Sequence, residues 1–459
     1  MKNYSKKTIS IIMCLVMLTS LFTVGASAAA VEYTIINPYE SVEDLLPDAD
    51  NHYKTNLHTH STYSDATENL ANMVYEHYNQ DFDVLAFSDH GVIGRRWDQA
   101  PTIIPLYQYN PIIGNEQKHL TTEEFNAILA GTYQTPENER TKGRGMQCVT
   151  NAIEANMLVL NKNHVNGYFT EVTEGYLGEE NNFEEVIKRI HLDGGLSHIN
   201  HPGDWLGSGG DPDMARDPKN VAIFTEMMEK YDSCLGIEVF NAFDRPTSND
   251  RILWDEMLQV IIPQGERNVW GFANNDAHAT DEIDTCFMDF ILPEYSDATL
   301  RTAMEDGTFF AVSRYAHNEM GDDFVGTGAY PQFTEITVDD DQDTITITGI
   351  NCSAVEWIAN GEIIETVTTE ADGTITSTIK LREHSDDISC YVRAQLKGEG
   401  GITLTQPFVC DDGNMQPETE DEITRPNPLD QFSDIKDLFD LIEYIFKNNM
   451  IYALLKDLF

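Results

Sequence analysis

Helix-like and strand-like segments alternate from Thr55 to Arg314, and this alternation is the feature that most limits the fold. Helical patterns are found in residues 68–79, 183–192, 222–231, 248–262 and 300–305. Each is followed by a short apolar run typical of a buried strand, in residues 82–87, 195–200, 236–240, 269–273 and 308–312. Repeated helix–strand units favour a mostly parallel sheet or barrel covered by helices. We therefore predict an α/β fold for this region.

Residues 95–145 interrupt the alternation. They contain Pro101, Pro105, Pro111 and Pro136 and show no clean periodicity. Such a stretch is typical of a long insertion, and long loops commonly carry function. We expect this insertion to act as a lid over a site.

The pattern changes again after Pro331. Residues 334–407 are rich in Thr, Ile and Val at a period of two, with turn signals at Asn360-Gly361 and Asp372-Gly373. This predicts an antiparallel β-sandwich-like domain in residues 331–410. An acidic linker is expected in residues 411–428 and an amphipathic helical tail in residues 429–459. The tail fits two alternatives: docking on the β domain, or contact with a partner or the cell envelope.

The first 28 residues have the pattern of a signal peptide. Lysines precede an apolar stretch in residues 9–24, and Ala26-Ser27-Ala28 supplies a small-residue cleavage site. We expect cleavage after Ala28, secretion, and an extracellular mature protein whose α/β domain spans residues 29–330.

Charge and cysteine content exclude several classes of protein. The chain has 29 Lys+Arg against 77 Asp+Glu, a formal net charge of -48. Such a surface repels polyanions, so a nucleic-acid polymer is excluded as a partner and a small-molecule substrate is expected. No CxxC spacing is present, which excludes zinc-finger and thioredoxin classes. Cys352, Cys390 and Cys410 fall in one region, where a disulfide and buried free thiols are the alternatives.

Metal-competent side chains stand at the ends of the predicted strands. His58 and His60 follow a strand in residues 54–57 at a spacing of two, which places both imidazoles on one side. The other positions of this kind are Asp65, Asp89, His90, Glu154 (after a predicted strand in residues 148–153), His164, His201, Asp276 and His278. The C-terminal ends of barrel strands converge on one mouth, so we expect these side chains to meet. Imidazole and carboxylate groups bind Zn, Mn and Fe, and the pattern therefore predicts a divalent metal site.

Taken in order, the runs NLHTHSTYSD, AFSDHG, AIEANM with NKNHVNGYF, LSHINHPGDW and FANNDAH resemble the PHP superfamily, named for polymerase and histidinol phosphatase. The resemblance covers roughly residues 56–314. The β region, which ends YVRAQLKGEGGITLTQPFV, is more loosely similar to a secreted branch that includes carbaryl-hydrolase-like metallohydrolases. The resemblance implies a distorted seven-stranded (β/α) barrel, similar to a TIM barrel, that holds three metal ions.

The resemblance also implies a ligand set for each metal. The first metal is expected on His58, His60, Glu154 and Asp276. The second is expected on Glu154, which bridges the two ions, with His164 and His201. The third is expected on Asp65, His90 and His278. Ala66 and Asn275 depart from residues common in the family, but neither is a ligand.

Four neighbouring residues receive other roles. Asp89 is expected to orient a histidine and, with Glu154 and Asp276, to take part in catalysis. His198 is expected in the core, because it lies three residues before His201 and points to another side of the strand. Glu238 and Asn241 are expected at the mouth, in either a structural or a catalytic role.

Three dications would outweigh the charges of the three carboxylate ligands, which favours an anionic substrate. The leading hypothesis is a phosphoesterase that uses metal-activated water on a small phosphorylated compound. An amide, carbamate or carboxylic ester hydrolase is the first alternative, and a non-catalytic binding protein is the second. Arg314, Lys142 and Arg144 are candidate phosphate clamps.

Overall fold

The computed structural model describes residues 32–101, 116–134, 139–155, 163–172, 183–265, 267–413 and 415. The predicted signal peptide and C-terminal tail, and all but the first residues of the linker, lie outside the described residues. Among the residues described, no helix has the length and apolar composition needed to cross a membrane.

The predicted helices and the strands that follow them are present to within a few residues, and the α/β part contains further elements that were not predicted. Its strands are β2 (His52–Asn56), β3 (Val84–Ala86), β4 (Gln147–Val149), β5 (Ile153–Ala155), β6 (Val165–Tyr168), β7 (Leu196–Ile199), β8 (Cys234–Asn241), β9 (Trp270–Asn274), β10 (Cys286–Ile291) and β11 (Phe309–Ser313). Its α-helices are α2 (Leu70–Asn79), α3 (Thr122–Leu129), α4 (Phe183–Leu192), α5 (Pro202–Leu206), α6 (Pro212–Arg216), α7 (Pro218–Lys230), α8 (Asp250–Ile261), α9 (Asp297–Asp306) and α10 (His317–Met320).

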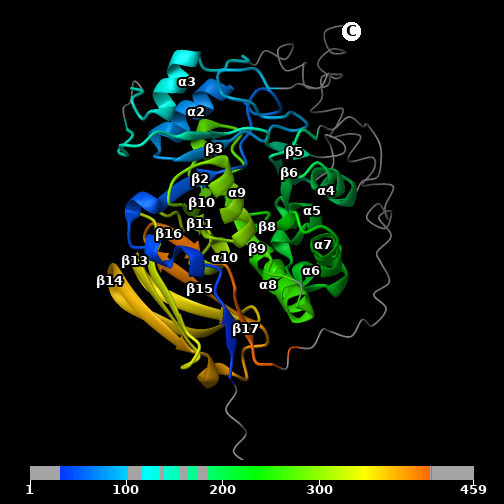
Figure 1. Cartoon of the computed structure of the whole chain (residues 1–459), viewed down its shortest axis with the longest axis vertical. Helices are drawn as coiled ribbons and strands as arrows, with labels where there is room; N and C mark the ends of the chain where they lie inside the picture. The colour runs from blue at the N-terminus through cyan, green and yellow to red at the C-terminus, as the bar shows by residue number, and fades with distance from the viewer. Residues whose placement is uncertain are drawn as a thin grey trace, which may run out of the picture.

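The strands lie in two sheets (Figure 1). The order β5-β6-β7-β8-β9 forms one sheet, in which β7, β8 and β9 are parallel. The other follows the path β1-β17-β15-β16-β11-β10-β2-β3-β4, and β10 is antiparallel to both β2 and β11. The predicted α/β class is confirmed. Strand pairing within the described ranges does not close a seven-stranded barrel, because only isolated bridges, Thr59 with Ala277 and His90 with Glu154, join the two sheets.

The strand predicted in residues 148–153 is in fact two strands, β4 and β5, which belong to different sheets. The chain turns between them at Asn151, whose φ is 60°. There the backbone of Asn151 and Ala152 bonds to Gly94 instead of continuing either sheet. Glu154 consequently lies at the centre of β5 and not beyond the end of a strand.

The insertion contains regular structure that the proline count concealed. Helix α3 begins with a capping box, in which Thr121 and Glu124 each accept a hydrogen bond from the other's backbone N–H. The sequence Thr-Thr-Glu-Glu was the available signal for this helix. The expected lid falls partly in residues 102–115 and 135–138, outside the described residues, and stays a prediction.

The C-terminal strands are β12 (Gln332–Asp339), β13 (Thr344–Ala359), β14 (Glu362–Lys380), β15 (Tyr391–Gly398), β16 (Gly401–Leu404) and β17 (Phe408–Asp411). Asn360 and Gly361 form the predicted two-residue turn, with φ values of 50° and 76°. Asp372-Gly373 is not a turn between strands but an irregularity inside β14, where the pairing jumps from Thr368 to Gly373.

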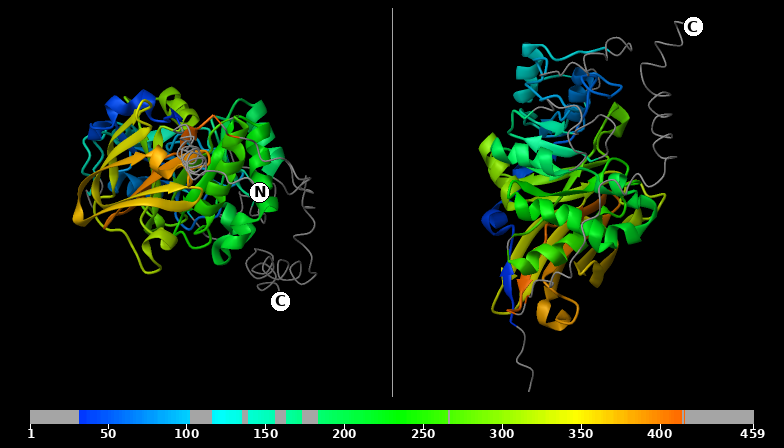
Figure 2. Two further views of the ribbon diagram at one scale, coloured as in Figure 1. Left: turned by 90° about the horizontal axis from the view of Figure 1, so that it is seen from below. Right: turned by 90° about the vertical axis from the view of Figure 1, so that its right-hand side faces the viewer.

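The β region is continuous with the α/β part, because β16 pairs with β11. The N-terminal strand β1 (Thr34–Ile36) in turn pairs with β17. Figure 1 and the right-hand view of Figure 2 show that α3 and the β12–β17 region lie toward opposite ends of the molecule. Separate folding of residues 334–407 and the domain boundary at 330/331 stay predictions.

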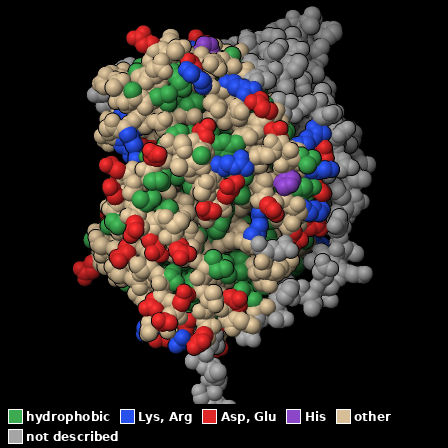
Figure 3. Space-filling model, in the orientation of Figure 1, with side chains coloured by type: hydrophobic (Ala, Val, Ile, Leu, Met, Phe, Trp, Pro, Cys, Tyr) green, Lys and Arg blue, Asp and Glu red, His purple; other side chains and the backbone are tan. Residues whose placement is uncertain are grey.

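The six cysteines of the described chain are free thiols, and Cys352, Cys390 and Cys410 are all buried. Of the two alternatives for these three residues, the structure therefore has the buried free thiols. Acidic side chains are spread over the face drawn in Figure 3, interspersed with Lys and Arg.

Candidate metal centre

Backbone pairing beyond the strand ends brings the predicted ligands together. The segments after β2 and β9 run side by side, since His60 donates its N–H to the Ala277 carbonyl and Asp276 donates to the His58 carbonyl, both at 3.0 Å. Next to them, Ser88 donates its N–H to Thr59 at 3.0 Å and accepts one from Glu154 at 2.9 Å. The four segments that carry most of the ligands therefore meet at one place.

Four ligand atoms lie close together. The Nε2 atoms of His58 and His60 lie 3.2 Å apart. Glu154 Oε2 lies 3.3 Å from His58 Nε2 and 3.0 Å from His60 Nε2. Asp276 Oδ1 lies 3.1 and 3.0 Å from the same two nitrogens. A tetrahedral ion with bonds of ~2.0–2.1 Å requires ligand atoms ~3.3 Å apart. This set therefore fits a single ion, and it is the set expected for the first metal.

The hydrogen bonding of the carboxylates supports the same conclusion. Glu154 Oε2 and Asp276 Oδ1 are buried, and neither has a hydrogen-bond partner within the described part of the chain. A buried carboxylate oxygen without such a partner is costly unless a cation balances it. Burial raises the pKa of Glu154, but the charges of the surrounding histidines, His90 first, outweigh it and hold that pKa well below its ordinary value. The carboxylate is ionised and suited to a metal.

Glu154 faces a different group of histidines with each oxygen. Its Oε2 lies 3.1 Å from His90 Nδ1, in addition to its contacts with His58 and His60. Its Oε1 lies 2.8 Å from His164 Nδ1 and 3.3 Å from His201 Nε2. This arrangement suits a bridging carboxylate. The ligand atoms of His90, Glu154 and His164 are close enough to share an ion, whereas His201 lies beside that group.

Asp65 stands on the open side of the cluster. Its carboxylate lies 3.4 Å from His90 Nε2, 3.3 Å from His278 Nε2 and 3.6 Å from His60 Nδ1. These four residues form a third group that could hold an ion among the described residues, so His60 joins the three ligands expected for the third metal. The side chains of Asp65 and His278 are 50% and 33% exposed, while those of His58 and His60 are fully buried. The exposed pair marks the approach from solvent.

Glu238 holds parts of the metal centre in place through hydrogen bonds. His58 Nδ1 donates to Glu238 Oε1 at 2.8 Å, which fixes the imidazole with Nε2 toward the other ligands. The same buried carboxylate accepts hydrogen bonds from the His201 backbone at 3.0 Å and from the Asn241 amide at 2.9 Å. Of the two roles left open for Glu238, these contacts describe a positioning role. Its place within the long strand β8 gave no sign of a partner as distant as His58.

Asp89 hydrogen-bonds to serines of the turn after His60, and its expected roles in orienting a histidine and in catalysis stay predictions. Asp89 accepts hydrogen bonds from the Ser61 backbone at 2.7 Å, from the Ser61 hydroxyl at 2.8 Å and from the Ser64 hydroxyl at 2.6 Å. Ser64 Oγ lies 3.3 Å from His60 Nδ1, so Asp89 reaches that histidine only through a serine. The turn after His60 folds over the end of β3, and its serine hydroxyls donate hydrogen bonds to the Asp89 carboxylate.

His198 lies in the core, as expected. Its ring is stacked on Phe272 with centroids 4.4 Å apart, and its Nε2 lies 3.0 Å from the Tyr168 hydroxyl. Burial lowers the pKa of His198 to about 4. It belongs to none of the ligand groups found among the described residues.

The three candidate phosphate clamps are engaged in other contacts. Lys142 and Arg144 both pair with the buried carboxylate of Asp83, which directly precedes β3. Arg314 contacts Asp284 at 3.1 Å and the Gly400 carbonyl at 2.6 Å. All three side chains are therefore held in ion pairs or hydrogen bonds within the protein. Residue spacing in the sequence alone could not show these pairings.

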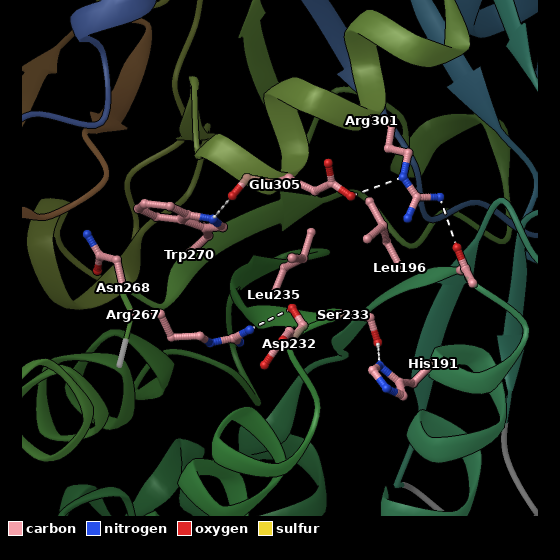
Figure 4. Close-up of a pocket in the computed structure, with 12 residues that line it drawn as sticks. His191, Leu196, Asp232, Ser233, Leu235, Arg267, Asn268, Trp270, Arg301 and Glu305 are labelled. Carbon is pink, nitrogen blue, oxygen red and sulfur yellow. Dashed lines mark hydrogen bonds and ion pairs between the residues drawn. The ribbon is translucent and has the colours of Figure 1, made fainter. Parts of the chain in front are cut away.

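A pocket of about 430 Å³ lies at the opposite ends of the strands (Figure 4). Leu196, Leu235 and Trp270 line it, and these residues lie at or near the N-terminal ends of β7, β8 and β9. None of the residues that line it belongs to the ligand groups of the described residues, so this pocket is not the metal centre.

Neither a protein-family model nor a curated protein matches the chain. Among solved structures, it is similar to a two-domain protein containing a predicted PHP-like metal-dependent phosphoesterase from Bacteroides vulgatus, with 15% identity over 79% of this chain and 97% of that chain and a TM-score of 0.39. It is also similar to PsfC from Pseudomonas syringae (16% identity, 56% and 88% coverage, TM-score 0.30). A third likeness is to a lesion-specific endonuclease from Pyrococcus furiosus (10% identity, 55% and 56% coverage, TM-score 0.31). At such identities and TM-scores these likenesses assign no family, and function has to be argued from the site itself.

Proposed function

We propose that the protein is a metal-dependent hydrolase that acts as a phosphoesterase on small phosphorylated compounds. The observation that carries this proposal is the position of Glu154, a buried carboxylate whose two oxygens face separate sets of histidines. Adjacent ligand groups that share one carboxylate are suited to holding neighbouring cations. Neighbouring cations activate water and neutralise the charge that develops on phosphate oxygens.

The side chains around the centre supply position and access. His58, His60, Glu154 and Asp276 would hold the innermost ion, and Glu238 fixes the His58 ring from behind. Asp65 and His278, the exposed members, form the side at which a substrate enters. The Asp89–Ser64 contact holds the turn that carries His60. Each of these roles requires only that the side chains are held in place before a metal or a substrate binds.

One observation favours the second candidate, a hydrolase of carboxylic esters, amides or carbamates. The three expected phosphate clamps are all paired elsewhere, so a phosphate would depend on the metals alone for neutralisation. A less highly charged carbonyl substrate does not need such a clamp. The two candidates share the centre and differ only in the bond that is attacked.

The test is an activity panel on the purified, metal-supplemented full chain. We expect hydrolysis of 4-nitrophenyl phosphate to exceed that of bis(4-nitrophenyl) phosphate, 4-nitrophenyl acetate and a 4-nitrophenyl carbamate. Preference for the acetate or the carbamate would replace the phosphoesterase with the second candidate. Absence of all four activities in a protein that carries its metals would contradict both and favour a binding protein.

The finer expectations are part of the proposal. We propose three ions of Mn, Zn or Fe, with elemental analysis as the test. We also propose a distorted barrel, supported by the bridges that join β2 with β9 and β3 with β5 beyond the strand ends. Export with cleavage after Ala28 is tested by N-terminal sequencing of secreted protein, and a retained Met1 would contradict it. Contact of residues 429–459 with a partner or the envelope stays a prediction.

A further inference from the structure

Two loops meet beside the metal centre, and no role has yet been given to them. The loop after β8 follows Asn241, the last residue of that strand, whose amide donates to Asp276 Oδ2 at 3.2 Å. Ala242 continues alongside β9 by bonding to the Asn274 carbonyl at 3.3 Å. Phe243 therefore stands two residues from a contact with a metal ligand, and two residues span at most ~7 Å.

The loop after β11 presents a matching aromatic residue. The rings of Phe243 and Tyr315 pack edge to face with centroids 5.2 Å apart, and both side chains are partly exposed. His317 follows in α10, with its ring 6.0 Å from that of Tyr315. His317 is only 8% exposed, yet neither of its ring nitrogens has a hydrogen-bond partner in the described structure. A buried imidazole in that condition is costly unless a ligand contacts it.

A buried ion-pair network fixes the two loops relative to each other. Arg251 of α8 binds Asp244 of the first loop through both terminal nitrogens and binds Glu319 of α10 at 2.8 and 2.9 Å. Asp244 also accepts the backbone N–H of His317 at 2.9 Å. Ala242, Asp244 and Ala316 have positive φ values of 47°, 57° and 41°. Backbone strain of this kind persists where the surroundings impose a conformation, and here it accompanies a rigid arrangement.

We propose that Phe243, Tyr315 and His317 form a subsite for an aromatic group of the substrate. Phe243 and Tyr315 contact the faces and edges of the ring, and His317 hydrogen-bonds a polar substituent on it. The subsite extends the proposed function by naming the substrate class as aryl esters, and it rests on that function for its neighbouring metal centre. No part of it belongs to the predicted ligand set.

The test is calorimetric binding of phenylphosphonate and methylphosphonate to the metal-loaded full chain. We expect the phenyl compound to bind about tenfold more tightly, and Phe243→Ala and Tyr315→Ala each to remove most of that ratio, as a lost aromatic contact would. Affinity for methylphosphonate should change less than twofold. Tyr295→Ala is the control, because Tyr295 follows β10 near the N-terminal end of β2. Phe243→Leu and Tyr315→Leu replace any alanine variant that does not fold.

His317 has its own comparison. The wild-type protein should bind 4-hydroxyphenylphosphonate about fivefold more tightly than phenylphosphonate, the gain of one hydrogen bond. His317→Phe should abolish that gain and keep the preference for phenyl over methyl.

Equal affinity of the wild-type protein for phenyl- and methylphosphonate, or an unchanged ratio in both aromatic variants, overturns the subsite. An unchanged gain in His317→Phe removes His317 from it. A phenyl preference in a protein that hydrolyses no ester overturns the proposed function and leaves the subsite in place. Binding of neither phosphonate overturns both.

Discussion

The two ends of strands β7, β8 and β9 differ in how their polar groups are satisfied. At the C-terminal ends, Glu154 and Asp276 keep buried oxygens without hydrogen-bond partners in the described chain. At the N-terminal ends, the polar groups around the 430 Å³ pocket bond to backbone carbonyls. Trp270 donates to Glu305 at 3.0 Å, Arg301 to Gly194 at 3.0 Å and Arg267 to Asp232 at 2.6 Å.

The comparison teaches that a cavity is a weaker sign of function than a group of ligand atoms that lack hydrogen-bond partners. The pocket is a cavity of about 430 Å³, but Trp270, Arg301 and Arg267 on its lining already donate to backbone carbonyls. The metal centre is compact, and its carboxylates need a cation to be stable. In α/β folds the C-terminal ends of strands carry reactive groups and the N-terminal ends serve stability, and these two ends differ in the same way.

Metal removal should produce the largest difference between the two ends. Chelation should abolish hydrolysis and lower the melting temperature, because ions that bind only the folded state add RT ln(1+[L]/Kd), ~4 kcal/mol at a thousandfold excess over Kd. Readdition of Mn2+ or Zn2+ should restore both, measured by calorimetry and by the phosphatase assay. A melting temperature that does not change on chelation would contradict a metal-stabilised centre.

The same substitution at the two ends should have opposite outcomes. Glu154→Gln should lose more than one ion per chain and most of the turnover, about 100-fold or more, because this carboxylate faces two ligand groups. Glu305→Gln, in the pocket, should keep full metal content and turnover, since its exposed pair with Arg301 is worth ~0.3–0.5 kcal/mol. Elemental analysis and initial rates check both, and full occupancy in Glu154→Gln would sink the bridging role.

Glu238→Gln tests the support beneath the centre. The amide removes the charge that holds the His58 ring, and loss of such a partner typically costs ~10–100-fold in metal affinity or activity. Competition with a metal indicator measures the affinity. An unchanged affinity would mean that the contacts of Glu238 serve packing only.

His198 and His201, which lie on and just after β7, test which residues belong to the metal centre. His201→Gln should weaken metal binding, because His201 Nε2 lies 3.3 Å from Glu154. His198→Gln should keep all ions and reduce stability by ~0.5–1.5 kcal/mol, because glutamine cannot stack on Phe272 as the imidazole does. Loss of metal from His198→Gln would show that the strand-end assignment is wrong.

The smallest effect is expected at the N-terminal end of β2. His52 faces acceptors on both ring nitrogens, Asp289 Oδ2 at 2.8 Å and the Leu46 carbonyl at 2.9 Å. Burial lowers the pKa of His52, but the charge and hydrogen bond of Asp289 outweigh it and raise that pKa above 6.5. The resulting stability is fully present below the unfolded pKa and is lost as pH rises through the folded pKa.

Urea unfolding across pH 5.5–9 should therefore show a decline in the wild-type protein that is absent in His52→Gln. A decline of equal size in the variant would assign the pH dependence to other groups.

Local sequence patterns predicted much of the fold. Helix α4 begins and ends where its apolar periodicity does, at Phe183 and Leu192. The predicted ligands lie within or close to strands whose ends meet at one place, and all except His201 fall in the ligand groups of the described residues. Their separate roles as ligands stay predictions.

What sequence patterns could not predict depends on distant pairing. Strand β10 was missed, and its antiparallel place between β2 and β11 is set by neighbours far along the chain. The roles of Asp89 and Glu238 could not be predicted for the same reason, because their partners Ser64 and His58 lie on other elements. The sequence also could not show that Arg144 is paired, because its partner Asp83 lies far from it along the chain.

The pairing of β1 with β17 has a mechanical consequence. Thr34 lies opposite Asp411 and Ile36 opposite Val409, so the two ends of the described chain leave side by side from the same end of this strand pair. A force that separates those ends loads the hydrogen bonds of this pair one after another, as in a zip, and not all together. Joining the ends with a short peptide should instead leave the pairing intact and yield a circular permutant whose new ends can be placed in an exposed loop.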